Sequence, residues 1–363
     1  MSSSETTADL SSPPTPREVA ATLLLSGSAI MLVLLALVSM ATGATGITLS
    51  SLPRALAAAI GQSSDPADLR AALVLLDLRL PRTLMAIFVG AALALAGAMM
   101  QGLFRNPLAD PFLLGSASGA ALALALAFAV MAAGGANGAA LAQMASPWLA
   151  RLGLTGAAFV GALGGVLLAL VLAQGVQQTL RLLLAGVVVG YVLGAVRDLV
   201  QLAEPDILQA MQGFTLGVTG FVGWSAVGLM AAVLAPLMLT AWALARVLDG
   251  LSLGESTAHS LGLPLAPMRA LLIGVLALGT GTAVAQTGLI GFVGLVAPHL
   301  VRAMAPSTHG PLVLLSALAG GLLLMAADVA ARVVIAPQEL PVGVLTAVLG
   351  GMYLLWLMHQ RSR

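Results

Sequence analysis

The chain has 363 residues, of which 60% are hydrophobic and only 8% are charged, and its formal net charge is +1. A soluble globular chain carries roughly 25% charged residues, so this composition indicates an integral membrane protein and excludes a basic nucleic-acid-binding surface. Cysteine and lysine are both absent, which excludes disulfides, cysteine-ligated metals and the G-x-x-x-x-G-K-S/T phosphate loop. If the chain depends on ATP, a separate subunit has to bind it.

The N-terminal segment differs from the rest of the chain. Residues 1–18 are rich in Ser, Thr and Pro with scattered charges, a composition typical of disordered segments. They lack the basic start and apolar core of a signal peptide. We therefore expect a disordered cytoplasmic tail at 1–18 and a single transmembrane domain over 19–363.

Apolar runs without charges predict the membrane-spanning helices, each of which needs about 20 residues. Residues 42–80 contain several prolines and charged residues and are expected to form an external loop with a short helix at most. Two runs, 111–150 and 270–301, are too long for one span and are divided at glycine, asparagine or proline. The pattern predicts an all-α protein with about ten spans. The predicted spans are 20–41, 82–104, 114–133, 153–174, 181–203, 226–246, 268–286, 291–305, 311–331 and 341–360.

The arginines give the expected orientation. Ten spans with the tail inside place both termini in the cytoplasm, with eight arginines inside and six outside. This difference is a weak positive-inside bias. The small residues Gly90, Gly97 and Gly102 on the second span predict close packing of helix backbones in lipid.

No catalytic motif is found. The H-E-x-x-H pattern is absent, and the run 115–119 has Ala117 where a G-x-S-x-G nucleophile turn requires serine. A transporter driven by an ion gradient needs acidic residues in the middle of its spans, and the predicted spans place the acidic residues in loops or near helix ends. We therefore expect no catalytic site and no metal site.

Two polar segments are candidates for function. Residues 249–264 form a predicted loop between spans, in which Ser252 and Glu255 fit a capping box. This segment predicts a docking surface for a soluble partner, with an ordinary structured loop as the alternative. Asp328 and Arg332 are spaced to form an ion pair on one helix face. The polar stretch that starts at Arg197 fits either the lining of a vestibule or a solvated loop.

An ordered set of motifs extends from about residue 50 to the C-terminus. The segments are "LRLPRTLMAIFVGAALALAGAMMQGLFRNPLADPFLLGSASGA", "RLLLAG", "LSLGESTAHSLGLPL", "GLIGFVGLVAPHLVR", "ADVAAR" and "ELPVGVLTAVLGG". Their order and spacing resemble the iron-chelate and vitamin B12 permeases of bacterial type II ABC importers. No single motif is decisive, whereas the ordered set is specific.

The resemblance implies a ten-helix permease subunit of the bacterial inner membrane that pairs with a second copy of itself. Two ATPase subunits would hold ATP and Mg, a periplasmic binding protein would deliver the substrate, and this chain would bind no cofactor. The implied function is import of a bulky iron chelate, either a ferric siderophore or heme. A cobalamin importer of the same family is the alternative.

The resemblance also implies roles for residues that match the family motifs. Three arginines are expected to dock the binding protein: Arg79, Arg82 and Arg332. Five residues of the 249–264 loop are expected to couple to the ATPase: Leu253, Gly254, Glu255, Ala258 and Leu261. Seven polar residues are expected to line the translocation path: Gln177, Gln178, Thr179, Arg197, Gln201, Gln209 and Gln212.

One departure from the family pattern concerns His309. Many members have a G-x-D-H-R run after the P-H-x-x-R motif, whereas here "APSTHGPL" keeps the histidine and lacks the neighbouring aspartate and arginine. This difference bears on local contacts and substrate identity rather than on the class of protein.

Overall fold

The computed structural model describes residues 16–43, 47–134, 147–174, 179–220 and 222–361. Within these residues the chain is helical and contains no strand, which confirms the predicted all-α class. Helix α1 begins at Pro16, so the last residues of the expected tail are helical. The rest of that tail lies outside the described residues.

Nine helices of the described part of the chain are long and apolar enough to cross a membrane. They are α1 (Pro16–Ala41), α4 (Leu80–Phe104, with a helical extension before it), α5 (Ser116–Ala133), α7 (Pro147–Ala173), α8 (Thr179–Ala203), α10 (Trp224–Ala243), α13 (Leu265–Thr287), α15 (His309–Val333) and α16 (Val342–Arg361).

The predicted span 291–305 is a short helix. Helix α14 (Val293–Met304) has 12 residues, which at 1.5 Å per residue is about 18 Å, less than the ~30 Å hydrocarbon core. It starts after Phe292, whose backbone is left-handed with φ 67. The prediction of about ten spans is therefore met by nine long helices and one short helix that begins inside the bundle.

The expectation of an external loop over 42–80 is wrong for its second half. After α2 (Leu52–Ala59), helix α3 (Pro66–Ala72) continues through a π-helical segment (Leu73–Arg79) directly into α4. The Asp65 side chain caps this long helix by accepting from the backbone N–H of Ala67 at 2.9 Å, and Pro66 suits its first turn. The charged residues here lie at the start of a helix that projects beyond the apolar region.

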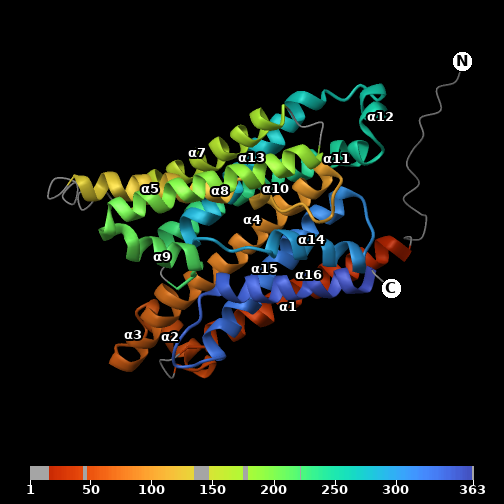
Figure 1. Cartoon of the computed structure of the whole chain (residues 1–363). Helices are drawn as coiled ribbons and strands as arrows, with labels where there is room; N and C mark the ends of the chain where they lie inside the picture. Colours follow the sequence, from red (N-terminus) through yellow and green to blue (C-terminus); the bar gives the residue numbers. More distant parts are fainter. Residues whose placement is uncertain (1–15, 44–46, 135–146, 175–178, 221, 362–363) are drawn as a thin grey trace, which may run out of the picture.

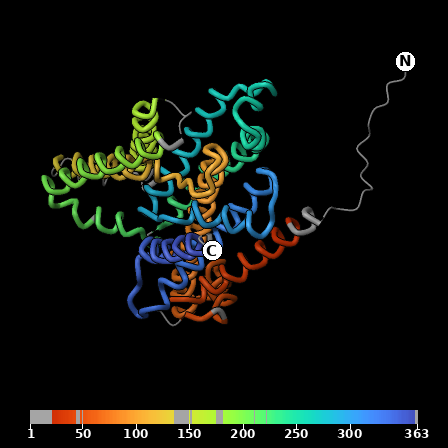
Figure 2. The backbone as a smooth tube through the Cα atoms, turned by 45° about the vertical axis from the view of Figure 1, so that its right-hand side comes forward, coloured from red at the N-terminus to blue at the C-terminus, as the bar shows by residue number. Residues whose placement is uncertain are grey.

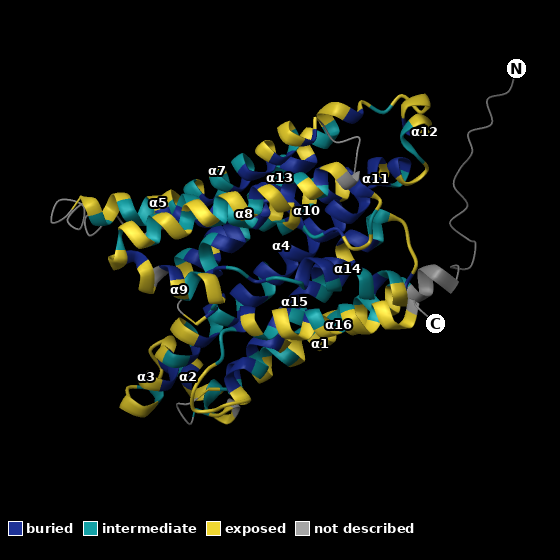
Figure 3. Cartoon of the chain, viewed as in Figure 1, coloured by how far each residue is buried: buried dark blue, intermediate teal, exposed yellow. Residues whose placement is uncertain are grey.

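Helix α4 forms the centre of the bundle and is buried along most of its length (Figures 1 and 3). Glycines allow its neighbours to approach closely: a Cβ on Gly90 would collide with the carbonyl of Gly320 in α15, and one on Gly97 with the carbonyl of Gly294 in α14. The predicted backbone packing at Gly90 and Gly97 is thus confirmed, because only small residues permit this contact.

The remaining helices lie in two groups around α4. Figures 1 and 2 show α5, α7 and α8 together on one side, and α1, α15 and α16 on the other. The irregular segment after Leu216 hydrogen-bonds to two helix ends: Val218 N–H donates at 2.8 Å to the carbonyl of Thr287, the last residue of α13, and Gly343 N–H in the first turn of α16 donates to Gly217 O at 3.1 Å. Non-helical backbone at this depth requires such internal partners, because lipid supplies none.

The two ends of the bundle carry different elements (Figure 1). One end, called here the α2–α3 end, also contains the start of α4 and the end of α15. The other, called the α11–α12 end, carries the short helices α11 (Ala245–Ser252) and α12 (Glu255–Ser260) and the end of α16. Helix α9 (Leu208–Leu216) follows α8 and precedes the irregular segment at Gly217.

Candidate functional sites at the two ends of the bundle

A cluster of four charged residues, called here the ion cluster, joins α4, α15 and the start of α16 at the α2–α3 end. Asp328 is fully buried, and its carboxylate lies 3.0 Å from Arg82 and 2.8 Å from Arg332. Arg82 also pairs with Glu339 at 2.7 Å. The Thr219 hydroxyl donates to the same Asp328 oxygen that binds Arg82. The Asp328–Arg332 ion pair predicted from spacing is present, within a larger network.

Two arginines cap the C-terminal end of α1. Arg332 Nη1 donates to the carbonyls of Ser39 at 2.8 Å and Thr42 at 3.0 Å. Arg79 Nη1 donates to the carbonyls of Met40 at 2.6 Å and Ile47 at 3.0 Å. Carbonyls in the last turn of a helix lack intrahelical partners, and a cation there also interacts favourably with the helix dipole. These bonds fix α1 to α4 and α15.

The structure brings the three predicted docking arginines together at one end, with little exposed surface. Arg79 and Arg332 are each 6% exposed. Glu339 is the most accessible member of the ion cluster, with 45% of its side chain exposed. It lines a cavity of about 470 Å³ together with Arg82 and Thr219. The docking role stays a prediction, and the accessible charge beside Arg82 in this conformation is a carboxylate.

Sequence reasoning did not pair Arg82 with Asp328 or Glu339, which are 246 and 257 positions away. A usable signal was present: the predicted topology places the start of the second span and the end of the ninth on the same side of the membrane. Two opposite charges at such positions favour a contact. Thr219 carried no comparable signal, because it follows an irregular segment.

The predicted coupling loop, 249–264, contains the end of α11 and the whole of α12. Leu253 and Leu261 are 67% and 62% exposed, whereas Ala258 is fully buried. Glu255 accepts a hydrogen bond from Arg269 of α13 at 2.9 Å. The loop therefore presents two leucines to its surroundings while Ala258 and Glu255 hold it to the bundle.

The predicted capping box is wrong. Ser252 is the last residue of α11 and donates to Asp249 O at 2.6 Å, and the N-cap of α12 is Gly254 without a side-chain cap bond. Gly254 has φ +111, a conformation that L side chains rarely adopt. The chain therefore turns sharply at this glycine, and Glu255 points to Arg269 instead of back to the first turn.

A second polar cluster lies at the α11–α12 end, where α4, α14 and α15 meet α11. Gln101 of α4 accepts from Arg302 of α14, and His309 of α15 contacts Asp249 of α11 at 2.7 Å. Gln101, Arg302 and His309 also line a cavity of about 270 Å³ with Arg105. The His309–Asp249 bond connects the root of the predicted coupling loop to α15, and the Gln101–Arg302 bond joins α4 to α14 beside it.

The proposed path residues are only partly described. Gln177 and Gln178 lie outside the described residues, as does the side chain of Thr179. Arg197 donates to Asp198 at 2.7 Å, so its charge is paired. The three other glutamines lie on or after α8 and are half-buried or exposed: Gln201, Gln209 and Gln212.

Two observations bear on a path. Gln209 lines a cavity of about 380 Å³ beside Gly288 and the irregular backbone. Helix α8 exposes large apolar side chains along its length, including Val188, Tyr191 and Leu199. The role of these residues in a path stays a prediction.

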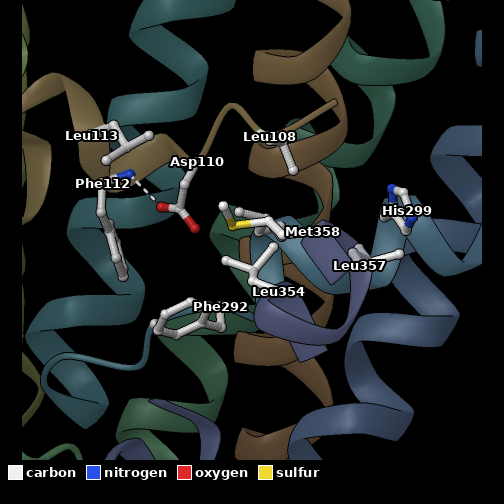
Figure 4. Close-up of a pocket in the computed structure, with 11 residues that line it drawn as sticks. Leu108, Asp110, Phe112, Leu113, Phe292, His299, Leu354, Leu357 and Met358 are labelled. Atoms are coloured by element: carbon white, nitrogen blue, oxygen red, sulfur yellow. Dashed lines mark hydrogen bonds between the residues drawn. The ribbon is translucent and has the colours of Figure 1, made fainter. Parts of the chain in front are cut away.

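An apolar cavity of about 430 Å³ near the α11–α12 end lies between the segment after α4 and the end of α16 (Figure 4). Asp110 points toward it, and one carboxylate oxygen accepts the Phe112 N–H at 2.8 Å. Burial raises the pKa of Asp110 to about 6, against the opposing effect of this hydrogen bond. Most of the other lining side chains are apolar, among them Phe292, Leu354 and Met358.

Comparisons with known proteins agree with one another. Residues 31–360 match the sequence model of the FecCD transport family. The hemin transport system permease protein HmuU of Yersinia pestis is 39% identical over 291 residues, covering 79% of this chain and 84% of HmuU. The vitamin B12 import system permease protein BtuC of Salmonella typhimurium is 40% identical over 295 residues, covering 81% of this chain and 86% of BtuC.

A solved structure of a metal-chelate type ABC transporter in an inward-facing conformation has the same fold. It superposes with a TM-score of 0.74 at 27% identity and covers 93% of this chain and 99% of that one.

Proposed function

This chain belongs to the FecCD transport family, and on that premise we propose that it moves a bulky iron chelate, a ferric siderophore or heme, from periplasm to cytoplasm. The similarity by itself identifies the chain as a permease of a metal-chelate, heme or vitamin B12 type ABC importer. The observation that carries the proposal is the match of almost the whole chain to permeases of this kind. Cobalamin is the alternative cargo, since a vitamin B12 permease is equally similar.

The proposed energy source is ATP hydrolysed on partner subunits. The chain has no lysine, so it cannot form the lysine-containing phosphate loop that ATPases of this type use. We propose that two ATPase subunits, holding ATP and Mg, bind at the α11–α12 end. The exposed Leu253 and Leu261 would seat in the ATPase, while Gly254, Glu255 and Ala258 set the shape of the loop.

The proposed docking surface for a periplasmic binding protein is the α2–α3 end. Arg82 and Glu339 form its accessible part, and Arg79 and Arg332 act behind them by fixing the end of α1. Arg54 of α2 and Arg70 of α3 are exposed at the same end together with Asp65 and Asp77, so these residues add no net positive charge. Replacing Arg79 and Arg82 with glutamate is expected to weaken docking most at low salt.

The proposed assembly is a homodimer in the bacterial inner membrane with both termini in the cytoplasm. Apolar side chains are exposed along α8 and α16, and we propose that these faces contact the second copy and form an apolar path between copies. An apolar path with few polar groups suits weak binding of a large chelate, because the binding protein then sets specificity.

An uptake experiment tests this function. The chain is reconstituted in vesicles with its partner ATPase and binding protein, and uptake of heme, a ferric siderophore and cobalamin is compared. Uptake of an iron chelate that requires ATP supports the proposal. Uptake of cobalamin alone supports the alternative cargo, and robust ATP hydrolysis by the purified chain alone would contradict the assignment.

A further inference from the structure

His309 has a defined partner outside its own sequence motif. Its backbone N–H and its Nδ1 both contact the same oxygen of Asp249, at 3.0 and 2.7 Å. His309 is the first residue of α15, and the preceding Thr308 makes no side-chain cap bond. Because the first N–H groups of a helix lack intrahelical partners, the Asp249 carboxylate takes the place of the missing cap. Its negative charge also lies at the positive end of the α15 dipole.

Helix α4 holds the histidine in this position from the other side. A Cβ placed on Gly102 of α4 would lie only 2.8 Å from His309 Nε2. The His309 side chain is 13% exposed and that of Asp249 35%. The imidazole is therefore enclosed between α4 and α11, and glycine at position 102 leaves the space that it needs.

The contact between His309 and Asp249, called here the tie, lies at the start of the exposed loop. Near Asp249 in sequence, Leu248 and Leu251 are 0% and 3% exposed, whereas Leu253 is 67% exposed. At the opposite end of α15, Asp328 and Arg332 belong to the ion cluster. A single helix of 25 residues, about 37 Å long, thus connects the loop with the α2–α3 end.

We propose that Asp249 is a positioning residue that fixes the α11–α12 loop to the first turn of α15, so that movement of the loop displaces α15 as a unit. This inference rests on the proposed function, because it concerns how an ATPase bound at the loop moves the permease. Without the tie, the loop follows the ATPase while α15 stays in place.

The tie is tested first on the purified full-length chain by hydrogen exchange. Asp249→Ala removes the acceptor, and exchange in residues 245–252 and 309–312 is expected to rise about tenfold, because a charge-assisted hydrogen bond is lost. Asp249→Asn keeps an acceptor oxygen in the same place and is expected to stay within about twofold of wild type. Asp206→Ala removes an exposed carboxylate distant from the tie and serves as the control.

The functional role is tested in the complete importer by the number of substrate molecules moved per ATP hydrolysed. This ratio is expected to fall about tenfold in Asp249→Ala and to recover in Asp249→Asn, in proportion to the lost hydrogen bonds. Gly102→Ala gives an independent variant: alanine favours the helix, yet its Cβ would lie 2.8 Å from His309 Nε2, so the ring must leave its present position and the Asp249 contact is disturbed. It is expected to lower the ratio without altering Asp249, also where Asp249→Ala is too unstable to purify.

The outcomes separate this inference from the proposed function. Faster exchange in Asp249→Ala or Gly102→Ala together with a wild-type ratio overturns the inference alone, as does unchanged exchange in both variants. A wild-type chain that binds no ATPase and moves no substrate overturns the proposed function and this inference with it.

Discussion

The two ends of the bundle handle charge in opposite ways. At the α2–α3 end, Asp328 is fully buried and contacts two arginines, and further arginine bonds fix the end of α1. At the α11–α12 end, the loop exposes Leu253 and Leu261 and is held by a few bonds at its root. A buried ion network tolerates little displacement, because a charge that separates from its partners there is not compensated by water. The comparison therefore predicts a rigid end and an adaptable end.

The largest expected effect comes from breaking the rigid end. Asp328→Asn leaves Arg82 and Arg332 without their shared carboxylate and is expected to lower the free energy of unfolding by about 3–5 kcal/mol. Thermal unfolding in detergent measures it. Asp198→Asn breaks an ion pair whose carboxylate is 63% exposed and is expected to change stability by less than about 1 kcal/mol. If both variants lost the same free energy of unfolding, the ion cluster would contribute no more to stability than an exposed ion pair.

The second effect concerns function at the adaptable end. Glu255→Arg places a second cation beside Arg269 and is expected to leave the membrane dimer intact while substrate-stimulated ATPase activity falls about tenfold, because like charges repel. ATPase assays of the reconstituted importer and size measurements of the permease check the two parts. Asp206→Arg makes the same change of charge outside the 249–264 loop and serves as the control. Wild-type stimulation in Glu255→Arg would refute the coupling role.

The third effect contrasts two carboxylates. Asp328 has arginine partners, whereas Asp110 lies in apolar surroundings with its pKa raised to about 6. Between these two pKa values the folded state binds a proton that the unfolded state has released. The contribution of Asp110 to the free energy of unfolding is therefore fully present below about pH 4 and is lost as the pH rises through about 6. Acidification from pH 7 to 5 is expected to stabilise wild type by about 1 kcal/mol more than Asp110→Asn. Parallel pH profiles of thermal unfolding would contradict this.

The smallest effect sharpens the docking proposal. Glu339→Gln frees Arg82 Nη1 from its exposed carboxylate partner and is expected to tighten binding of an acidic partner about threefold at low salt. The gain is expected to vanish near 1 M salt, where screening is effective within about 3 Å. Affinity titrations at two salt concentrations measure it. Weaker docking in this variant would show that Glu339 itself contacts the partner.

Much of the fold was predictable because apolar runs report membrane spans directly. The same rule failed where a helix contains charged residues. Residues 66–79 carry Asp and Arg and are nevertheless helical, because Asp65 caps the helix and the segment extends past the apolar region. It also overestimated α14, because the irregular backbone before Phe292 takes up part of the apolar run.

The functional ends were less predictable, because they depend on pairing across long distances in sequence. The i, i+4 spacing indicated the Asp328–Arg332 pair, but nothing local indicated that Arg82 completes it. A capping box at Ser252 matched the pattern, yet the positive φ of Gly254 redirects the chain. Local patterns cannot distinguish a cap from a turn until the backbone on both sides is known.

The arginine caps on α1 have a consequence for biosynthesis. Helix α1 is synthesised before the two arginines that bind its end: Arg79, which bonds to Met40 O, follows 39 residues later. Arg332, which bonds to Ser39 O, follows only 293 residues later. Until then only one of the two arginines that bind the end of α1 has been made, and the Ser39 carbonyl lacks its Arg332 partner. Helix α1 is therefore fully fixed only after α15 has been synthesised, and a chain truncated before α15 cannot complete the attachment of α1.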